Sequence, residues 1–498
     1  MVTMTHRTPR ERWILSPEAE RGPRGSKVVA TVGPATDAIL PELLHSGVNV
    51  CRINFSHGKP DEHRERVAAI RAAATEIGRV VAILGDLQGP KIRIGQFLEE
   101  PVQLDVGAPF IIDYALDQAA GTATQVGTTY QGLPGDCSAG DLLVLGDGLI
   151  ELLVEQTEAT RVHCRVAVGG PLTGGKGINK RGGGLSAGAL TAKDHKDIVL
   201  AAELNVDFLA VSFPRNADDM HSARQLAKDA GLQCSMVAKL ERAEAVQDPD
   251  TLHDLISASD VIMIARGDLG IEIDYSALMG VQKYVIAKAR EMGRATITAT
   301  QMMESMIKNP VPTRAEVLDV ANAVLDGTDA VMLSGETAVG DYPVATVQAA
   351  VRVIRGAEAS AEFQSGAIDD ALCEDIDESI AMAVMSVAAR LERVKAIICF
   401  SASGNTPKLL SRFLSRIPIY ALVEDPKTLA RIALYRGVNP VLYQPRVREY
   451  EAMNNDAINW LIDRRFVTSG DRVILAKGDL HEERRSGGTN TLKVIRID

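Results

Sequence analysis

The sequence has few of the features that mark secreted, membrane-spanning or nucleic-acid-binding proteins. Its six cysteines contain no CxxC pair, which predicts reduced, mostly buried thiols rather than a disulfide framework. No stretch approaches the ~18 uninterrupted apolar residues of a membrane span, and the N-terminus lacks the apolar region of a secretion signal. The formal net charge of -11 argues against bulk electrostatic binding to nucleic acid or an anionic membrane. We therefore expect a cytoplasmic protein that holds any anionic ligand with a local cluster of positive side chains.

The overall composition is that of a large globular protein. Hydrophobic residues make up 46% of the chain and charged residues 24%, close to the averages for soluble domains. At roughly 100 to 200 residues per domain, 498 residues predict about three domains.

Strand and helix patterns alternate between Lys27 and Glu336. About eight short β-branched runs recur there, and most are apolar at successive positions, as in parallel strands that are covered on both faces. Helical patterns separate them: Thr191 is a predicted N-cap with Asp194 three residues on, and Gly327 is predicted to end another helix. The alternation predicts an α/β fold built on a (β/α)8 TIM barrel.

Two further segments interrupt or follow this barrel. We assign residues 26–87 and 185–360 to the barrel and residues 1–25 to an N-terminal segment. Residues 88–184 are rich in short Val, Thr and Leu runs with turn signals, which predicts a small inserted β-barrel domain with glycine-rich hinges. It is interpreted as a lid, with a surface insertion without function as the alternative. Residues 370–498 predict a C-terminal open α/β domain with a regulatory role.

Polar side chains stand where the predicted barrel strands end. The C-terminal ends of the strands in such a barrel share one mouth, so these side chains are expected to converge there. They are Thr31, Arg52, Asn54, Ser56, Asp86, Ser212, Lys239, Glu241, Arg266, Asp268, Thr300, Ser334 and Glu336.

Two carboxylates beside a lysine predict a magnesium site. Lys239 and Glu241 are two residues apart on one strand, so both point to the same side, and Asp268 ends the next strand. Carboxylate oxygens suit a hard divalent cation whose shell is completed by water and substrate oxygens. Backbone amides near Gly267 are expected to receive a substrate carboxylate. Ordinary salt bridges are the alternative for Lys239 and Glu241.

Five motifs carry a family resemblance: CRINFSHG, GDLQGPKIRIG, KLERAEA, ARGDLGIE and ATQMMESM. With them, the chain resembles the pyruvate kinases, specifically bacterial members of a potassium-independent branch, over nearly its whole length. The resemblance implies a glycolytic phosphotransferase that moves the phosphoryl group of phosphoenolpyruvate to ADP, giving pyruvate and ATP. It also implies Mg2+, with Mn2+ as a substitute, and an allosteric homotetramer.

The resemblance also assigns roles to individual residues. Arg52, Lys239 and Thr300 would be catalytic, and with Gly267 and Asp268 they would bind the substrate. Glu241 and Asp268 would hold Mg2+. The nucleotide would contact Asn54, His57, Arg93 and Lys176, and the monovalent-cation position would comprise Asn54, Ser56, Asp86 and Leu87. For His57 itself we expect a packed, hydrogen-bonded position rather than a catalytic one.

One residue departs from the pattern of the potassium-dependent members. They read Asp-Thr-Lys-Gly-Pro-Glu where this chain reads DLQGPK from Asp86 to Lys91. An ammonium group at this place supplies the positive charge that K+ otherwise brings, and it repels a bound cation at short range. We therefore expect activity without K+. The alternative is that Lys91 points to solvent or to the lid and the ion still binds.

The loop SASGNT in the C-terminal segment is a candidate effector site. Hydroxyls and backbone amides between a strand and a helix hold phosphate groups in many proteins. The resemblance implies that Ser401, Ser403, Gly404, Asn405 and Thr406 bind a phosphorylated sugar or a nucleotide, whereas a plain turn would have a similar sequence.

Two rival functions are considered. A Mg2+-dependent lyase or aldolase on the same barrel also stabilises enolates of pyruvate, and fold alone does not separate it from a kinase. A noncatalytic regulatory paralogue is the second rival, and the presence of Lys239, Glu241, Asp268 and Thr300 argues against it.

Overall fold

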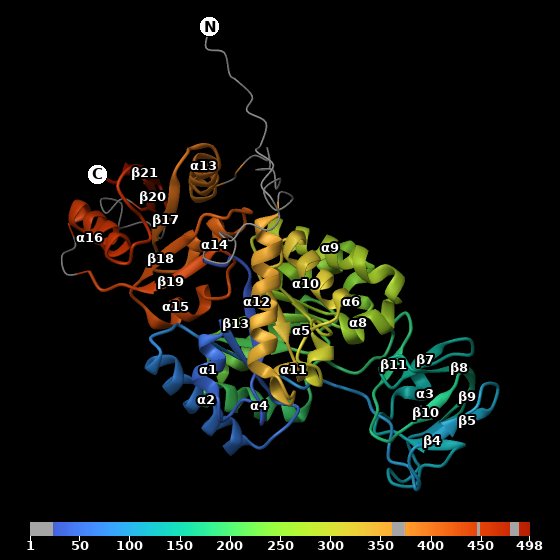
Figure 1. Ribbon diagram of the computed structural model, residues 1–498. Coiled ribbons are helices and arrows are strands. Elements are labelled where there is room, and N and C mark those ends of the chain that lie inside the picture. The colour runs from blue at the N-terminus through green and yellow to red at the C-terminus, as the bar shows by residue number, and fades with distance from the viewer. Residues whose placement is uncertain (1–22, 361–372, 374, 446–448, 479–487) are drawn as a thin grey trace. The chain divides into compact units, whose positions relative to one another are not determined.

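Eight strands close into a barrel (Figure 1). The computed structural model describes residues 23–360, 373, 375–445, 449–478 and 488–498. The barrel order is β1-β16-β15-β14-β13-β12-β3-β2, which confirms all eight strands expected from the sequence. Their bounds are β1 (Lys27–Thr31), β2 (Val50–Asn54), β3 (Ala82–Asp86), β12 (Phe208–Val211), β13 (Ser235–Leu240), β14 (Val261–Ala265), β15 (Ala295–Ala299) and β16 (Ala330–Leu333).

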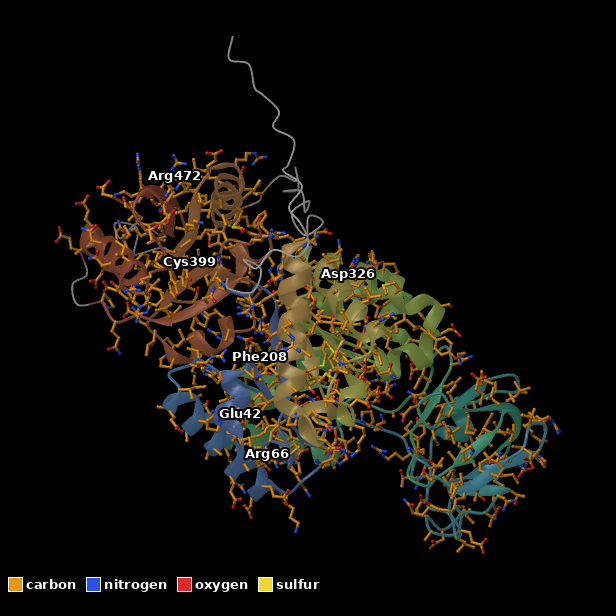
Figure 2. All side chains as sticks on the ribbon, viewed as in Figure 1. Glu42, Arg66, Phe208, Asp326, Cys399 and Arg472 are labelled. Carbon is orange, nitrogen blue, oxygen red and sulfur yellow. The ribbon has the colours of Figure 1, made fainter. Side chains whose placement is uncertain are left out.

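All barrel strands except β2 are buried along their whole length, as their continuous apolar sequences predict. Every residue of β1, β3, β13, β14 and β15 is buried. Phe208, labelled in Figure 2, begins β12 and is 1% exposed. A strand covered on both faces has no polar side to expose, so its apolar residues follow one another without alternation.

Helices connect the barrel strands, and their ends follow local sequence signals. Thr191 and Asp194 form a capping box at the start of α4, and Gly327 ends α10 in the left-handed conformation with φ +101°. Both features were predicted. The helices are α1 (Leu40–His45), α2 (Pro60–Glu76), α4 (Ala192–Glu203), α5 (Ala217–Asp229), α6 (Glu244–Gln247), α7 (Pro249–Ala258), α8 (Arg266–Ile273), α9 (Tyr275–Glu291), the 3-10 helix η2 (Glu304–Ile307), α10 (Arg314–Asp326), α11 (Gly335–Ala338) and α12 (Pro343–Ala359).

The segment after β3 is almost entirely β-structure, as expected, with one short helix, α3 (Leu133–Asp136). Six strands form a sheet in the order β11-β7-β8-β9-β5-β6, and β10 pairs with β4 (Figure 1). Phe110, Leu143, Leu152 and Val162 are fully buried in its own hydrophobic core. The strands are β4 (Val102–Leu104), β5 (Pro109–Asp113), β6 (Gln125–Gly127), β7 (Leu142–Leu145), β8 (Ile150–Thr157), β9 (Arg161–Val168), β10 (Gly170–Leu172) and β11 (Ile178–Lys180).

The C-terminal part of the chain forms an open sheet with helices, as predicted. The sheet order is β19-β18-β17-β20-β21, and only the pair of β20 and β21 is antiparallel. Cys399 on β17, labelled in Figure 2, is fully buried. The elements are α13 (Ile376–Arg390), β17 (Val394–Phe400), α14 (Asn405–Ser411), β18 (Ile419–Val423), α15 (Pro426–Ile432), β19 (Val438–Leu442), α16 (Tyr450–Asp463), β20 (Arg472–Lys477) and β21 (Thr491–Arg496).

The contacts within the chain define two compact units. One comprises residues 1–50, 71–82 and 302–498, and the other comprises residues 51–70 and 83–301. This division crosses the barrel, so the domain boundaries expected from the sequence stay a prediction, and most of the N-terminal segment lies outside the described residues.

The structure can be compared with the expectations for the cysteines and for membrane-spanning segments. All six cysteines are free thiols, and four of them are buried. Within the described ranges, no helix is long and apolar enough to cross a membrane.

Candidate active site

A buried cluster of opposite charges lies where β2, β3 and β13 end. The Lys239 ammonium is 2.9 Å from Glu241 Oε1 and 3.3 Å from Asp86 Oδ1, and it donates to Ser212 Oγ at 2.7 Å. Arg52 Nε donates to Asp86 Oδ2 at 2.6 Å. These side chains come from positions up to 189 residues apart in the sequence, and the parallel strands of the barrel bring them together.

Two groups of the cluster, Asp86 and Lys239, have pKa values shifted in favour of their charged forms despite their burial. Burial alone would raise the pKa of the Asp86 carboxyl, but Lys239 and Arg52 together outweigh it and lower that pKa. Burial likewise opposes the charge of Lys239, and the carboxylates of Asp86 and Glu241 outweigh it, so the pKa of the ammonium is raised. Lys239 is therefore a permanent positive charge that is only 9% exposed.

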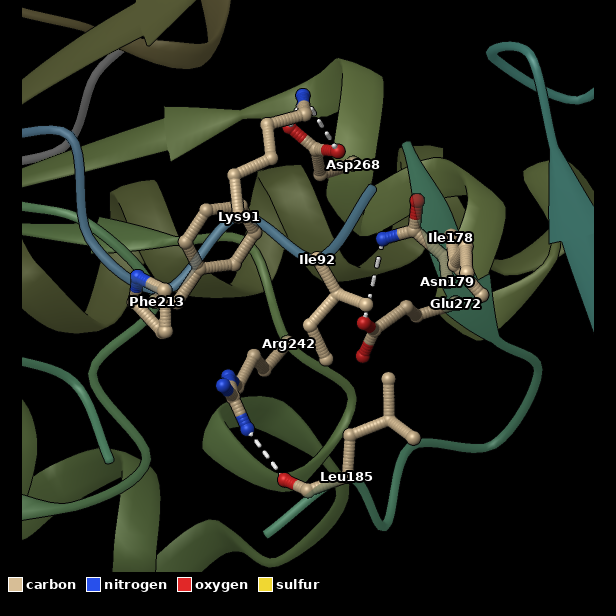
Figure 3. A pocket seen from close by; sticks show the side chains of 10 residues that line it. Lys91, Ile92, Ile178, Asn179, Leu185, Phe213, Arg242, Asp268 and Glu272 are labelled. Carbon is tan, nitrogen blue, oxygen red and sulfur yellow. Dashed lines mark hydrogen bonds and ion pairs between the residues drawn. The ribbon is translucent and has the colours of Figure 1, made fainter. Parts of the chain in front are cut away.

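Asp268 lies in the first turn of α8 and contacts a lysine from the loop after β3. Lys91 Nζ is 3.3 Å from both Asp268 carboxylate oxygens (Figure 3). The Nζ of Lys91 thus lies against Asp268, while its Cε lies close to Gly177 of the inserted segment. Lys91 and Asp268 line one pocket with Arg242 and Glu272. Glu272 accepts from Asn179 Nδ2 of the inserted segment, and Arg242 donates to the carbonyl of Leu185, which directly follows that segment.

The carboxylates fit a divalent cation. Burial raises the pKa of Glu241, Lys239 opposes that effect, and the negative charge of Asp268 adds to it. A cation shared by Glu241 and Asp268 would relieve their repulsion, and carboxylate oxygens are the ligands that Mg2+ prefers. Among the described residues there is no group of three or more His, Cys, Asp or Glu side chains suited to a metal. Substrate oxygens and water would therefore have to complete the coordination.

Thr300 follows β15 and faces the first turn of α8. Its hydroxyl accepts a hydrogen bond from Gly267 N at 2.9 Å and donates to Ala299 O at 2.6 Å. Gly267 precedes Asp268, so the threonine hydroxyl and the candidate metal ligand are both positioned by the same helix start.

Comparison with known proteins identifies the family. Residues 23–347 match the family model described as pyruvate kinase, barrel domain, and residues 378–495 match the model of the pyruvate kinase alpha/beta domain. Pyruvate kinase II of Salmonella typhimurium is 50% identical over 478 residues, which cover 95% of this chain and 99% of that protein. The chain belongs to the pyruvate kinase family.

Other pyruvate kinases are also similar over more than nine-tenths of this chain. The Haemophilus influenzae protein is 51% identical over 458 residues, covering 91% of this chain and 96% of its own length. Pyruvate kinase 2 of Synechocystis is 38% identical over 478 residues, which cover 95% of this chain and 79% of that protein. The match runs through both the barrel and the C-terminal segment. The family assignment therefore does not rest on the barrel fold alone.

The position that resembles the monovalent-cation site of pyruvate kinases is largely engaged by protein groups. Asn54 Oδ1 accepts from Ser56 N at 3.1 Å, and Leu87 O accepts from Ser212 Oγ at 2.7 Å. Asp86 Oδ1 makes no hydrogen bond, although Lys239 lies within ion-pair distance of it. One buried carboxylate oxygen thus has capacity for a further positive partner.

Two of the four residues expected to contact the nucleotide, Arg93 and His57, are exposed, and the other two, Asn54 and Lys176, are half-buried. Arg93 is exposed and donates to Gly175 O at 2.9 Å, and Lys176 is half-buried with its carbonyl bonded to Ile94 N at 2.9 Å. His57 is also exposed, so the packed position expected for it was wrong. It follows Ser56 in the turn after β2, where the chain leaves the barrel wall before α2 begins.

The SASGNT loop is held mainly by its own hydrogen bonds. Gly404 N donates to Ser401 Oγ at 3.0 Å, and Asn405 N donates to Ser403 Oγ at 3.4 Å. Thr406 is 6% exposed, and its hydroxyl is hydrogen-bonded to the hydroxyl of Thr489. Ser403 is therefore a better candidate than Thr406 for contact with an external phosphate.

Three contacts in the site were not predicted. Ser212 was noted at the end of its strand, but its bond to Lys239 was not anticipated. The pairing of Lys91 with Asp268 joins residues 177 positions apart, and Arg242 donates to Leu185 O at 2.7 Å, directly after the inserted segment (Figure 3). The only sequence signal for them was their place at a strand end or beside a motif.

Proposed function

We propose that this chain transfers the phosphoryl group of phosphoenolpyruvate to ADP, as a glycolytic pyruvate kinase. The observation that carries the proposal is the buried Lys239, held between Asp86 and Glu241 at the mouth of the barrel. A phosphoryl group in flight carries negative charge on its equatorial oxygens, and catalysis consists mainly of positioning and neutralising that charge.

The proposed substrate contacts follow from charge and position. The Arg52 guanidinium, fixed through its Nε on Asp86, would present N–H donors to the phosphate. Lys239 would supply a point charge to the transferring group. Gly267 and Asp268 would receive the substrate carboxylate at the start of α8, where the first backbone N–H groups have no partner within the helix and Gly267 N donates to Thr300 Oγ1.

Glu241 and Asp268 are the residues that would hold Mg2+ or, as a substitute, Mn2+. The bound ion would neutralise the anionic oxygens of the substrates. The three carboxylates Asp86, Glu241 and Asp268 face three cations, Arg52, Lys239 and Lys91, so the protein groups of the site are close to neutral together. A divalent cation then makes the site positive, which suits two anionic substrates.

The reaction requires one phosphoryl transfer and one proton transfer. The bond between phosphorus and the enol oxygen breaks as an oxygen of the ADP β-phosphate bonds to phosphorus, and the enolate that remains takes a proton at its terminal carbon to give pyruvate. We assign the relay of that proton to the Thr300 hydroxyl and a water molecule. Asn54, His57, Arg93 and Lys176 are proposed to contact the nucleotide, with the inserted segment as a lid.

The remaining proposals concern ions and regulation. Lys91 is proposed to make K+ dispensable, since its ammonium already lies in the site against Asp268. Asn54, Ser56, Asp86 and Leu87 remain the candidate monovalent-cation position. The loop Ser401–Thr406 is proposed to bind a phosphorylated sugar or nucleotide, and the assembly is proposed to be a homotetramer, as the resemblance implies.

A direct assay tests the proposed reaction. The purified protein is incubated with phosphoenolpyruvate, ADP and Mg2+, and the formation of pyruvate and of ATP is measured separately. Equal amounts of both products are expected, and neither should form without ADP. Pyruvate formed without ATP would instead indicate phosphatase or lyase chemistry. The variant Lys239→Met serves as the control for contaminating kinase.

A further inference from the structure

Thr300 has a backbone conformation that a threonine rarely adopts. Its φ is +69°, and the following Gln301 has φ +54°. A β-branched side chain is unfavourable in this left-handed region, so the surrounding structure must hold it there. Thr300 stands directly after β15, at the mouth of the barrel.

The guanidinium of Arg266 holds the backbone on both sides of this residue. Arg266 Nη2 donates to Thr300 O at 2.7 Å, and Arg266 Nε donates to Ala299 O at 3.2 Å. Its third nitrogen, Nη1, donates to Gln282 Oε1 at 3.4 Å, which anchors the fork on α9. Because a guanidinium is planar and rigid, two bonds to successive carbonyls restrict the peptide between them.

The same contacts affect the threonine hydroxyl. Thr300 Oγ1 donates to Ala299 O at 2.6 Å, and this carbonyl also accepts from Arg266 Nε. Two donors on one carbonyl compete, so the guanidinium weakens the bond that the hydroxyl must give up in order to pass its proton elsewhere. Gly267 N, the next residue after Arg266, holds the hydroxyl oxygen in place at 2.9 Å.

We propose that Arg266 is a positioning residue for proton delivery: it holds Thr300 in its left-handed conformation and orients the hydroxyl toward the mouth of the barrel. Arg266 is 8% exposed and acts through the threonine backbone rather than on the substrate. The inference rests on the proposed function, in which Thr300 relays the proton to the enolate. It predicts that Arg266 matters for protonation much more than for substrate binding.

The test separates protonation from the overall reaction. The exchange of pyruvate methyl hydrogens for deuterium is followed by proton NMR in D2O with Mg2+ and inorganic phosphate, and steady-state rates are measured with phosphoenolpyruvate. Arg266→Lys keeps the charge but loses the planar fork. It should slow the exchange at least about tenfold, because small misplacements of a reacting group are costly. The KM for phosphoenolpyruvate should stay within about threefold of wild type, and the solvent isotope effect on kcat should rise.

A matched control and a double variant complete the design. Arg224→Lys removes a similar arginine bond, 2.9 Å to Ala258 O, between α5 and the end of α7, and it should leave exchange unchanged. Thr300→Ala should slow exchange by itself. The double variant Arg266→Lys with Thr300→Ala should be no slower than Thr300→Ala alone, since both changes act through one hydroxyl.

Three results would overturn the inference. In the first, Arg266→Lys exchanges pyruvate hydrogens at the normal rate while Thr300→Ala is slow. In the second, the double variant loses as much exchange rate as the two single variants lose together. In the third, Arg266→Lys has a raised KM for phosphoenolpyruvate but a normal exchange rate. Normal exchange in Thr300→Ala would overturn the relay assignment itself, and the inference with it. If Arg266→Lys does not fold, as judged by its melting curve, Arg266→Gln is measured under the same criteria.

Discussion

The contact between Lys91 and Asp268 makes the potassium dependence of this enzyme a sharp test of the site. Two unit charges 3.3 Å apart interact by ~1 kcal/mol in water and ~5 kcal/mol at the effective dielectric of a protein surface. The Lys91 and Asp268 side chains are 27% and 18% exposed, so the attraction lies between these limits. Lys91→Glu replaces this attraction by repulsion of similar size and lowers the charge of the site by two units.

The substitution should therefore create a requirement for a monovalent cation. A change of ~1.4 kcal/mol in transition-state stabilisation is tenfold in rate, and exchanging the attraction for an equal repulsion changes the interaction energy by at least ~2 kcal/mol. Initial rates are measured with Mg2+ in a buffer whose only monovalent cation is tetramethylammonium, and again with added K+. We expect wild type to change little, and we expect K+ to raise the rate of Lys91→Glu more than about tenfold.

The control variant is Lys91→Met, which removes the charge without reversing it and should respond to K+ to an intermediate degree. Activation of wild type by more than about tenfold would refute the argument, because the ammonium would then not replace the ion. So would a Lys91→Glu enzyme that is fully active in tetramethylammonium alone.

Four further predictions follow from the site and its surroundings. Lys239→Met should lower kcat by ~10²-fold or more with little change in the KM for phosphoenolpyruvate, because the charge acts mainly on the transferring group; a loss under about tenfold contradicts this. Asp268→Asn should raise the Mg2+ concentration needed for half-maximal rate, and an unchanged Mg2+ titration argues against a metal ligand. Ser403→Ala combined with Thr406→Ala should abolish activation by phosphorylated sugars or AMP while the saturated rate stays near normal, with Ser403→Ala alone as the check that lost packing at Thr406 is not responsible. Burial raises the pKa of Glu272 to about 7, so the folded state binds this proton more tightly than the unfolded state and stability falls as pH rises from about 4.5 to 7. Glu272→Gln should therefore be more stable than wild type at pH 8, by at most ~3 kcal/mol in the free energy of unfolding. This gain should shrink by pH 5, and an equal gain at both pH values would contradict the raised pKa of Glu272.

Local signals in the sequence were sufficient for most of the fold. The capping box of Thr191 and Asp194 and the left-handed Gly327 were predicted because they satisfy backbone groups within a few residues. The barrel strands were predicted because burial on both faces leaves a continuous apolar run. Lys239 and Glu241 could be paired from their spacing alone, since residues two apart on a strand share a side.

The partners of the charged side chains depended on the closure of the barrel. The sequence placed Arg52, Asp86 and Lys239 at one rim, yet only the positions of β2, β3 and β13 around the barrel decide that Asp86 lies between the two cations. Lys91 was expected near the monovalent-cation position, and the path of the chain after β3 brings it instead to Asp268.

The sequence by itself determined the family, the strand and helix pattern and the identity of the reactive side chains, because these depend on composition and on contacts within a few residues. Only the tertiary structure decided that His57 is exposed and that Arg266 donates a hydrogen bond to the backbone carbonyl of Thr300. Exposure and long-range hydrogen bonds depend on which loops meet when distant strands become neighbours, and neither is encoded in the local pattern around one residue.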